Sequence, residues 1–232
     1  MIYINKQLCQ HIKFKIDENI KYFYKIENTK LDDNSFYFGT ISDIKYLKKN
    51  NYYNYSEENC DILTFLPFIK ENYLNFDGFF IQVCQLKNLD MSKKWFCRSN
   101  SGDKVWSGQY LDVSNLNIIQ NTLQDDDLLY IAPYKNLIGE IRCWCINEKV
   151  IEYSPYQSID CNFKYHFGEL NIGEVLNYVN KINDYWTPGE MFTIDICKVE
   201  NQLKIVEYNG FSTSGFYEAD INKICKNLKN YI

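Results

Sequence analysis

The sequence predicts an α+β protein in which a small α/β lobe, residues 1–92, precedes a larger and strand-rich domain, residues 93–232. Three observations lead to this fold class. The chain has 232 residues, of which 46% are hydrophobic, so it can form a sizeable core in one large domain or in two lobes. Strand-like and helix-like segments alternate in the first part. The second part contains two pairs of adjacent strand-like runs.

Four segments account for the first lobe. "SFYFG" at residues 35–39 reads as a strand, and Ser42 is the expected N-cap of a short helix in "SDIKYLKKN". "CDILTFLPFIKENYL" is expected to be helical, although Pro67 limits its regularity. "DGFFIQVC" reads as a further strand. Together these elements suit a small α/β lobe.

The second part is expected to hold two hairpins. "KWFC" and "LLYIAP" read as strands on either side of a helix in "VSNLNIIQNTL". "GEIRCWCI" and "KVIEYS" predict a hairpin that turns at Asn147-Glu148, and "MFTIDICKV" and "LKIVEYN" predict a second one. Apolar residues at positions 172, 175, 176, 179 and 182 have helical spacing, and "DINKICKNLKNYI" is expected to form a terminal helix.

Charge and cysteine content argue against several classes of protein. The formal net charge is −5 and the pI is about 5.2, so we expect no nucleic-acid partner. The nine cysteines form no CxxC pair and are expected to be buried, reduced thiols, and with only two histidines a zinc site is disfavoured. No signal peptide or membrane span is recognised, which favours a cytoplasmic protein without membrane association.

The segment "TIDICKVENQLKIVEYNG" predicts a metal site. A three-residue loop at residues 200–202 would place Asp195 opposite Glu207, with Cβ atoms roughly 5 Å apart, and Asn209 on the same face. Two carboxylates and one amide oxygen suit Mg²⁺ or Mn²⁺. The alternative is a solvated polar face with another register. Because facing carboxylates repel each other, removing one is expected to leave the stability of the metal-free protein level or slightly higher.

Two further segments carry charged residues in suggestive patterns. In "GEIRCWC", Glu140 and Arg142 are two positions apart on a strand and face the same way. They form either an exposed face or a site where Arg142 lies beside a reacting anion and Glu140 beside a ligand or metal. In "FCRSNSGDKVWSG", Arg98 and Lys104 flank glycine and small polar residues whose backbone N–H groups could bind phosphate. The alternative is a simple polar turn, and the spacing is not that of a P-loop.

Taken in this order, the three segments resemble the ATP-grasp superfamily, over roughly Lys93 to Ile232. The most similar pattern is that of the clade with arginine in place of the usual phosphate-contacting strand lysine, here Arg98. The "E-x-R" of "GEIRCWC", the "D…E-x-N" of the second hairpin and "YNGFSTSGFY" also match. The resemblance implies the ATP-grasp fold, in which a nucleotide lies between two α+β subdomains.

The resemblance also implies roles for individual residues. Arg98 would contact the α- and β-phosphates, and residues 101–108 would cover the phosphates, with Lys104 reaching them. Adenine would meet the strand that contains Ile131 and Ala132, although many members have an acidic residue where this chain has "IAPY". Arg142 and Lys104 would be catalytic. Nucleotide binding would involve Arg98, Lys104, Ser107, Gly108, Ile131, Ala132 and Glu140, and metal binding Asp195, Glu207 and Asn209.

The activity that the resemblance implies is ATP-dependent carboxylate–amine ligation through an acyl phosphate, with ATP and Mg²⁺ or Mn²⁺. The acid and the amine are not specified, and the many aromatic residues could shape a site for a peptide or protein acceptor. Two alternatives remain open. One is a kinase-like phosphotransferase on the same scaffold, and the other is a nucleotide-binding module without turnover.

Overall fold

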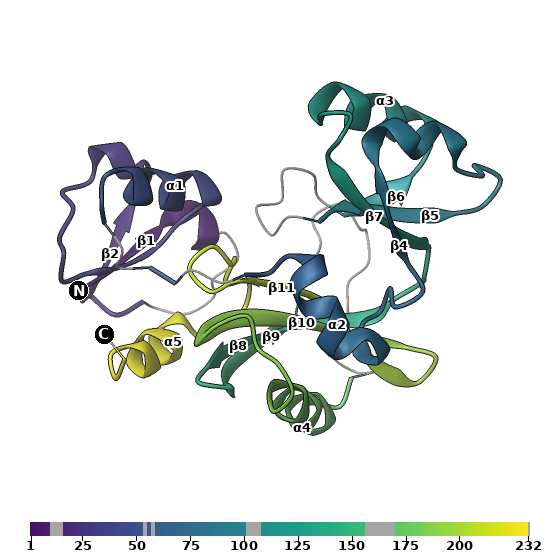
Figure 1. Ribbon diagram of the computed structural model, residues 1–232. Coiled ribbons are helices and arrows are strands. Elements are labelled where there is room, and N and C mark those ends of the chain that lie inside the picture. Colours follow the sequence, from purple (N-terminus) through teal and green to yellow (C-terminus); the bar gives the residue numbers. More distant parts are fainter. Residues whose placement is uncertain (10–15, 53–54, 57–58, 101–107, 156–169, 232) are drawn as a thin grey trace.

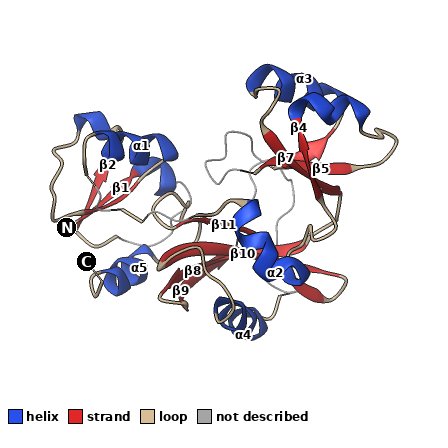
Figure 2. Ribbon diagram, in the orientation of Figure 1, coloured by secondary structure: helices blue, strands red, loops and turns tan. Residues whose placement is uncertain are grey.

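The computed structural model describes the chain except residues 10–15, 53–54, 57–58, 101–107, 156–169 and 232 (Figure 1). Its described strands form three sheets, with helices beside them (Figure 2). One four-stranded sheet lies between the N-terminal lobe and the lobe that carries α3, and the two chain termini lie close together (Figure 1). This mixture of sheets and helices confirms the predicted α+β class.

The N-terminal lobe contains a parallel sheet with strand order β2-β1-β3. Helix α1 follows β3, and Thr40 is its N-cap, so the expectation of an N-cap at Ser42 is wrong. The reason is a capping box: Asp43 N donates to the Thr40 hydroxyl, and Thr40 N donates to the Asp43 carboxylate. The bounds are β1 Ile2–Asn5, β2 Ile20–Phe23, β3 Phe36–Phe38 and α1 Ile41–Lys49, with single 3-10 turns at Lys6–Cys9 and Ile26–Asn28.

A second sheet has the strand order β4-β7-β5-β6 and is antiparallel. The expected strands in "DGFFIQVC", "KWFC" and "LLYIAP" are confirmed, as is the helix α3, which Asp112 caps. The lobe boundary expected at residue 92 stays a prediction, and the pairing of β4 with β7 crosses it. The bounds are β4 Phe79–Gln82, β5 Trp95–Ser99, β6 Gln109–Leu111, α3 Val113–Thr122 and β7 Leu128–Pro133, with 3-10 turns at Lys70–Asn72 and Val83–Asn88.

The central sheet consists of the two predicted hairpins, with strand order β11-β10-β8-β9. Residues of α2 and α4 belong to one core cluster with alternate residues of β8 and β10, whereas Trp144 of β8 packs in another cluster with the N-terminal lobe and α5. Both faces are therefore covered. The bounds are α2 Ile62–Ile69, β8 Ile138–Ile146, β9 Lys149–Pro155, α4 Ile172–Asn183, β10 Met191–Val199, β11 Gln202–Gly210 and α5 Ile221–Leu228.

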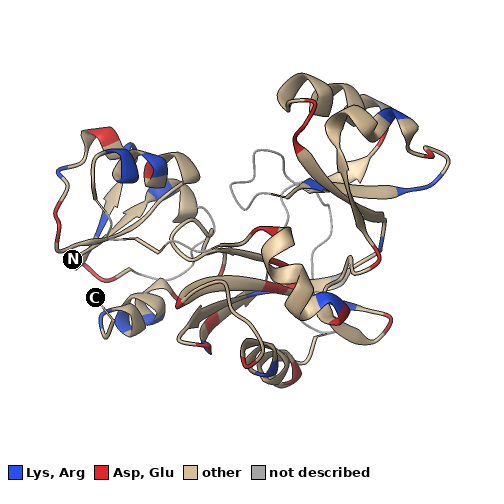
Figure 3. Ribbon diagram, viewed as in Figure 1, with Lys and Arg blue, Asp and Glu red and all other residues tan. Residues whose placement is uncertain are grey.

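The cysteines of the described ranges are free thiols. Six of these eight are buried, which agrees with the predicted role as reduced core residues. Burial raises the pKa of Cys97 to about 12, so this thiol is a weak nucleophile. No helix in the described part of the chain is long and apolar enough to cross a bilayer. In Figure 3, Lys and Arg alternate with Asp and Glu over the lobes, in keeping with the net charge of −5.

Both hairpins of the central sheet are closed by two-residue turns in the left-handed region. Asn147 and Glu148 have φ values of 45° and 66°, and Glu200 and Asn201 have values of 48° and 65°. Such turns match the right-handed twist of the strands and favour Asn and Gly. Glutamate is less suited to this conformation because its Cβ crowds the backbone.

Replacing Glu148 by Gly is therefore expected to raise the free energy of unfolding by about 0.5–1 kcal/mol, since relief of left-handed strain exceeds the entropic cost of glycine. Urea denaturation measures the change. The control is Glu18→Gly in an exposed turn without positive φ, which should not stabilise the protein. A loss of stability in Glu148→Gly would show that the turn is not strained.

Candidate nucleotide and metal site

The predicted pairing of Asp195 with Glu207 is present, but by a different route from the one expected. The loop has two residues rather than three, because Val199 pairs with Gln202. A bulge next to Asp195 shifts the register by one residue, so that Asp195 still faces Glu207. Two departures from the expected pairing therefore cancel. Thr193 pairs with Asn209, which lies on the same face of the sheet.

Arg142 forms a bidentate ion pair with Asp195. Its Nε donates to Oδ1 over 2.8 Å and its Nη2 to Oδ2 over 2.7 Å. Arg142 is 3% exposed and Asp195 is 0% exposed, which makes this a fully buried pair. Glu140, two residues earlier on β8, is 7% exposed, so the alternative of an exposed strand face is wrong. Planar pairing of this kind fixes the position of the guanidinium group.

Asn209 connects the two carboxylates. Its Nδ2 donates to Oδ2 of Asp195 and to Oε1 of Glu207, each over 3.0 Å. The amide nitrogen, not the expected oxygen, therefore faces the carboxylates, because acids without a metal need hydrogen-bond donors. The Oδ1 atom of Asn209 is buried and has no hydrogen-bond partner among the described residues. Such an atom is free to become a ligand when the amide turns over.

Arg98 reaches the same cluster from the sheet opposite. This residue of β5 is 5% exposed, and its Nη1 lies 3.2 Å from Oε2 of Glu207 on β11. Burial lowers the pKa of Arg98, but the neighbouring Tyr73 and Glu207 outweigh burial, so the pKa of this guanidinium is raised. The residue stays cationic. The sequence prediction that Arg98 and Glu207 share one site is confirmed in its geometry.

Formal charge balances within this cluster. The two cations Arg98 and Arg142 offset the two anions Asp195 and Glu207, and Nη2 of Arg142 is also 3.9 Å from Oε1 of Glu207. The expectation that opposed carboxylates repel each other in the metal-free protein is therefore wrong. The arginines and the Asn209 amide compensate the negative charge instead.

Other predicted site residues lie around this cluster. Gly108 is beside β5: a Cβ atom built there would lie 2.5 Å from the Phe96 ring and 3.4 Å from Cβ of Arg98. Glu140 is opposite Cys197 in the register, and burial followed by the charge of Glu140 raises the pKa of that thiol. Lys104, Ser107 and most of the expected phosphate cover lie outside the described residues.

The expected adenine contacts fall on β7. Ile131 and Ala132 are fully buried. Ile131 pairs with Phe79 on one side and Cys97 on the other, whereas the pairing with β4 ends before Ala132. Backbone groups from Ala132 onward are therefore better placed to receive a ligand than those of Ile131. Adenine binding at this strand stays a prediction.

Two aromatic residues of the site were not found from the sequence. The guanidinium carbon of Arg142 lies over the Tyr217 ring, 5.2 Å from its centroid, and Tyr217 has a φ of 51°. Tyr73 is buried beside Arg98; burial raises its pKa, and the charge of Arg98 opposes this shift. Tyr217 ends the segment "YNGFSTSGFY", but only the fold places its ring against Arg142.

Several solved structures have the same fold. The chain is similar to D-alanine–D-alanine ligase from Bacillus anthracis complexed with ATP, with a TM-score of 0.53, 14% identity and coverage of 99% of this chain and 91% of that one. The ligase of the same name from Helicobacter pylori has a TM-score of 0.53 and 14% identity, with 84% and 67% covered. A RimK domain ATP-grasp protein from Sphaerobacter thermophilus DSM 20745 has a TM-score of 0.51 and 7% identity, with 72% and 62% covered.

At these identities the likeness shows the fold alone, and it confirms the expected ATP-grasp fold. No curated protein gives a significant match. A family model described as an ATP-grasp domain, the third family of one clade of that superfamily, matches residues 75–228, which begins before the expected start at Lys93. The match covers more than half of the chain and includes the cluster of arginines and carboxylates. The chain therefore belongs to this family of ATP-grasp domains, and with it to the ATP-grasp superfamily.

Proposed function

We propose that this protein is an ATP-dependent carboxylate–amine ligase that acts through an acyl phosphate. The observation that carries the proposal is the buried cluster at the junction of two sheets, in which Arg98 of β5 meets Glu207 of β11 and Arg142 of β8 holds Asp195 of β10. Paired cations and carboxylates at such a junction suit a triphosphate and its metal. Family membership supports ATP as the substrate.

In this proposal Arg98 occupies the strand position that contacts the α- and β-phosphates. Its guanidinium offers several donors, and Glu207 uses only part of them. Gly108 leaves space beside Arg98 that a side chain would fill. Lys104 and Ser107 complete the proposed phosphate contacts.

The metal ligands would be Asp195, Glu207 and Asn209. The residues fit a hard divalent ion, since carboxylate oxygens converge with an amide whose Oδ1 is buried and without a partner among the described residues. Magnesium would neutralise phosphate charge when bound. Glu140 is proposed to lie beside the nucleotide or the metal.

The reaction has two transfers. A substrate carboxylate oxygen attacks the γ-phosphorus of ATP, and the bond to the β-phosphate bridging oxygen breaks, which gives an acyl phosphate and ADP. An amine nitrogen then attacks the acyl carbon, loses a proton, and phosphate leaves with the electron pair of the broken C–O bond. Arg142, held by Asp195, is positioned to stabilise the anionic oxygen of the intermediate.

Hydroxylamine trapping tests the proposed chemistry. Candidate acids are incubated with ATP, Mg²⁺ and hydroxylamine, and mass spectrometry identifies the products. A hydroxamate that forms together with ADP supports an acyl phosphate. A stable phosphorylated acceptor without hydroxamate would instead show a phosphotransferase, and ATP binding without ADP formation for every acceptor would favour a binding module.

Replacing Tyr217 by Ala is expected to slow ADP formation about ten-fold, because Arg142 loses the aromatic face that holds its guanidinium. Tyr217→Phe keeps the ring and should retain most of the activity. Initial rates with a working acceptor measure both effects. Equal losses in the two variants would show that the hydroxyl group, rather than the ring, is what matters.

A further inference from the structure

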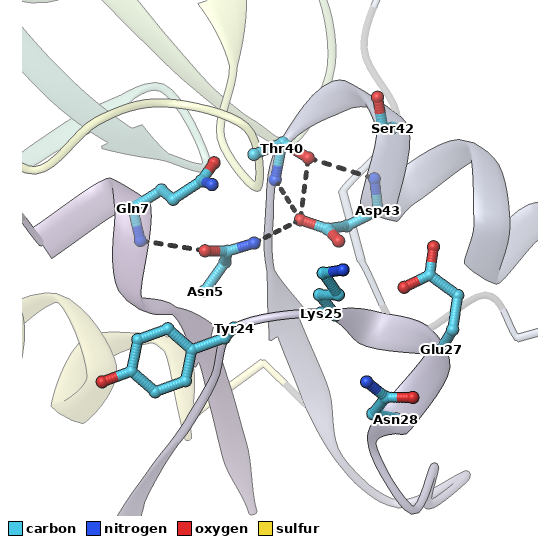
Figure 4. A pocket seen from close by; sticks show the side chains of 9 residues that line it. All are labelled: Asn5, Gln7, Tyr24, Lys25, Glu27, Asn28, Thr40, Ser42 and Asp43. Atoms are coloured by element: carbon cyan, nitrogen blue, oxygen red, sulfur yellow. Dashed lines mark hydrogen bonds between the residues drawn. The ribbon is translucent and has the colours of Figure 1, made fainter.

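A second polar site lies in the N-terminal lobe, away from the arginine and carboxylate cluster. A cavity of about 540 Å³ opens where β1 and β3 end and α1 begins (Figure 4). Ligands of α/β lobes commonly bind at the carboxyl ends of parallel strands, and β1, β2 and β3 are parallel. The lining residues are all polar: Asn5, Gln7, Tyr24, Lys25, Glu27, Asn28, Thr40, Ser42 and Asp43.

The floor of the cavity is formed by two buried polar side chains, Asn5 and Asp43, which are 2% and 6% exposed. One carboxylate oxygen of Asp43, Oδ2, accepts hydrogen bonds from Nδ2 of Asn5 over 2.7 Å, from Thr40 N over 2.7 Å and from Thr40 Oγ1 over 2.8 Å. The other oxygen, Oδ1, receives no hydrogen bond from the described residues, as Figure 4 shows. A buried acid at the floor thus keeps a free acceptor atom.

The charge of the cavity favours a cation over an anion. Asp43 and Glu27 carry negative charge and Lys25 carries positive charge, which leaves a formal balance of −1. The N-terminus of α1 would ordinarily attract an anion, but the Asp43 carboxylate already neutralises it. Phosphate and carboxylate ligands are therefore disfavoured here. The free Oδ1 atom and the neighbouring amide and hydroxyl groups suit a donor-rich cation.

We propose that this cavity binds a small polar ligand through a primary ammonium group, with Asp43 as its anionic partner. The cavity adjoins the loop after β11, because Gly39 N donates to the Ser212 carbonyl over 2.9 Å. The amine substrate of a ligase belongs to this chemical class. That identification rests on the proposed function, whereas ammonium binding rests on the cavity alone.

Glycinamide is a suitable probe because it carries an ammonium group and no carboxylate. In ¹⁵N–¹H spectra at neutral pH and constant ionic strength, it should shift the backbone amides of Thr40, Ser42 and Asp43 in a saturable manner. Acetate, inorganic phosphate and glycerol should not. The same saturable shifts with an anion or with glycerol, or none with glycinamide, would overturn the proposal.

Variants identify the partner of the ammonium group. Asp43→Asn retains an oxygen for the capping box but loses the charge, and it should bind glycinamide about ten-fold more weakly or worse. Asp112→Asn, a matched change at the cap of α3 in another lobe, should bind normally. Wild-type affinity in Asp43→Asn would refute the assignment.

If Asp43→Asn does not fold, Ser42→Trp decides, because this exposed residue lines the cavity without contributing to its floor. Binding of glycinamide by folded Ser42→Trp with wild-type affinity would place the site elsewhere. Glu207→Gln separates the two proposals, since it should impair ATP turnover and leave glycinamide binding intact. Glycinamide binding in a protein that shows no ligase activity would refute only the proposed function.

Discussion

The variant Asp195→Asn is expected to lose about 3–5 kcal/mol of unfolding free energy in the absence of metal, because it leaves Arg142 buried beside a neutral partner. The direction is opposite to the expectation from sequence, which considered only repulsion between Asp195 and Glu207. In the fold each carboxylate has an arginine beside it. Urea denaturation without metal measures the loss.

A double-mutant cycle shows whether the loss comes from the pair. Arg142→Met is also expected to be destabilising, but its effect should not add to that of Asp195→Asn, since the second change removes a partner that is already absent. Asp126→Asn is the charge-matched control, because this residue is exposed, and it should change stability by less than about 0.5 kcal/mol. Additive effects in the cycle would contradict the buried pair.

The second large effect is expected on catalysis. Glu207→Gln should lower Mg²⁺-dependent ADP formation about a hundred-fold or more, because a proposed metal ligand loses its charge and Arg98 loses its ionic partner. Stability should fall less than in Asp195→Asn, since the Glu207 side chain is 15% exposed and the carboxamide can still accept a hydrogen bond. Initial rates over a range of Mg²⁺ concentrations, with thermal melts of the metal-free protein, measure both quantities.

The matched control lies on the same hairpin. Glu200 occupies the exposed turn between β10 and β11, so Glu200→Gln makes the same chemical change away from the cluster and should keep wild-type turnover. Wild-type rates and Mg²⁺ dependence in Glu207→Gln would refute its role as a metal ligand. Unfolding of Glu207→Gln would instead assign the carboxylate a structural role.

Local patterns predicted most of the elements correctly. The turn at Asn147-Glu148, the helical spacing of α4 and the strand alternation of both hairpins depend on residues close in sequence, whose effects act over one turn or one strand pair. The helix start at Thr40 was missed because two adjacent hydroxyl residues compete for the cap. Only the capping box with Asp43 distinguishes them.

The register of the second hairpin marks the limit of such reasoning. Counting from the turn cannot reveal the bulge beside Asp195, because a bulge reflects how the strand bends within its sheet rather than a residue preference near the turn. The same limit explains why the sequence indicated a cluster of polar residues but not their hydrogen bonds.

The sequence by itself determined the fold class, both hairpins and the residues that form the candidate site. Only the tertiary structure decided how their charges are paired, since Arg98 meets Glu207 across two sheets and Arg142 meets Asp195 from 53 residues away. Tyr217 reaches Arg142 through a left-handed backbone that no local preference of tyrosine predicts. Secondary structure follows from neighbours in the chain, whereas the partner of a buried charge follows from which surfaces the packing of the sheets brings together.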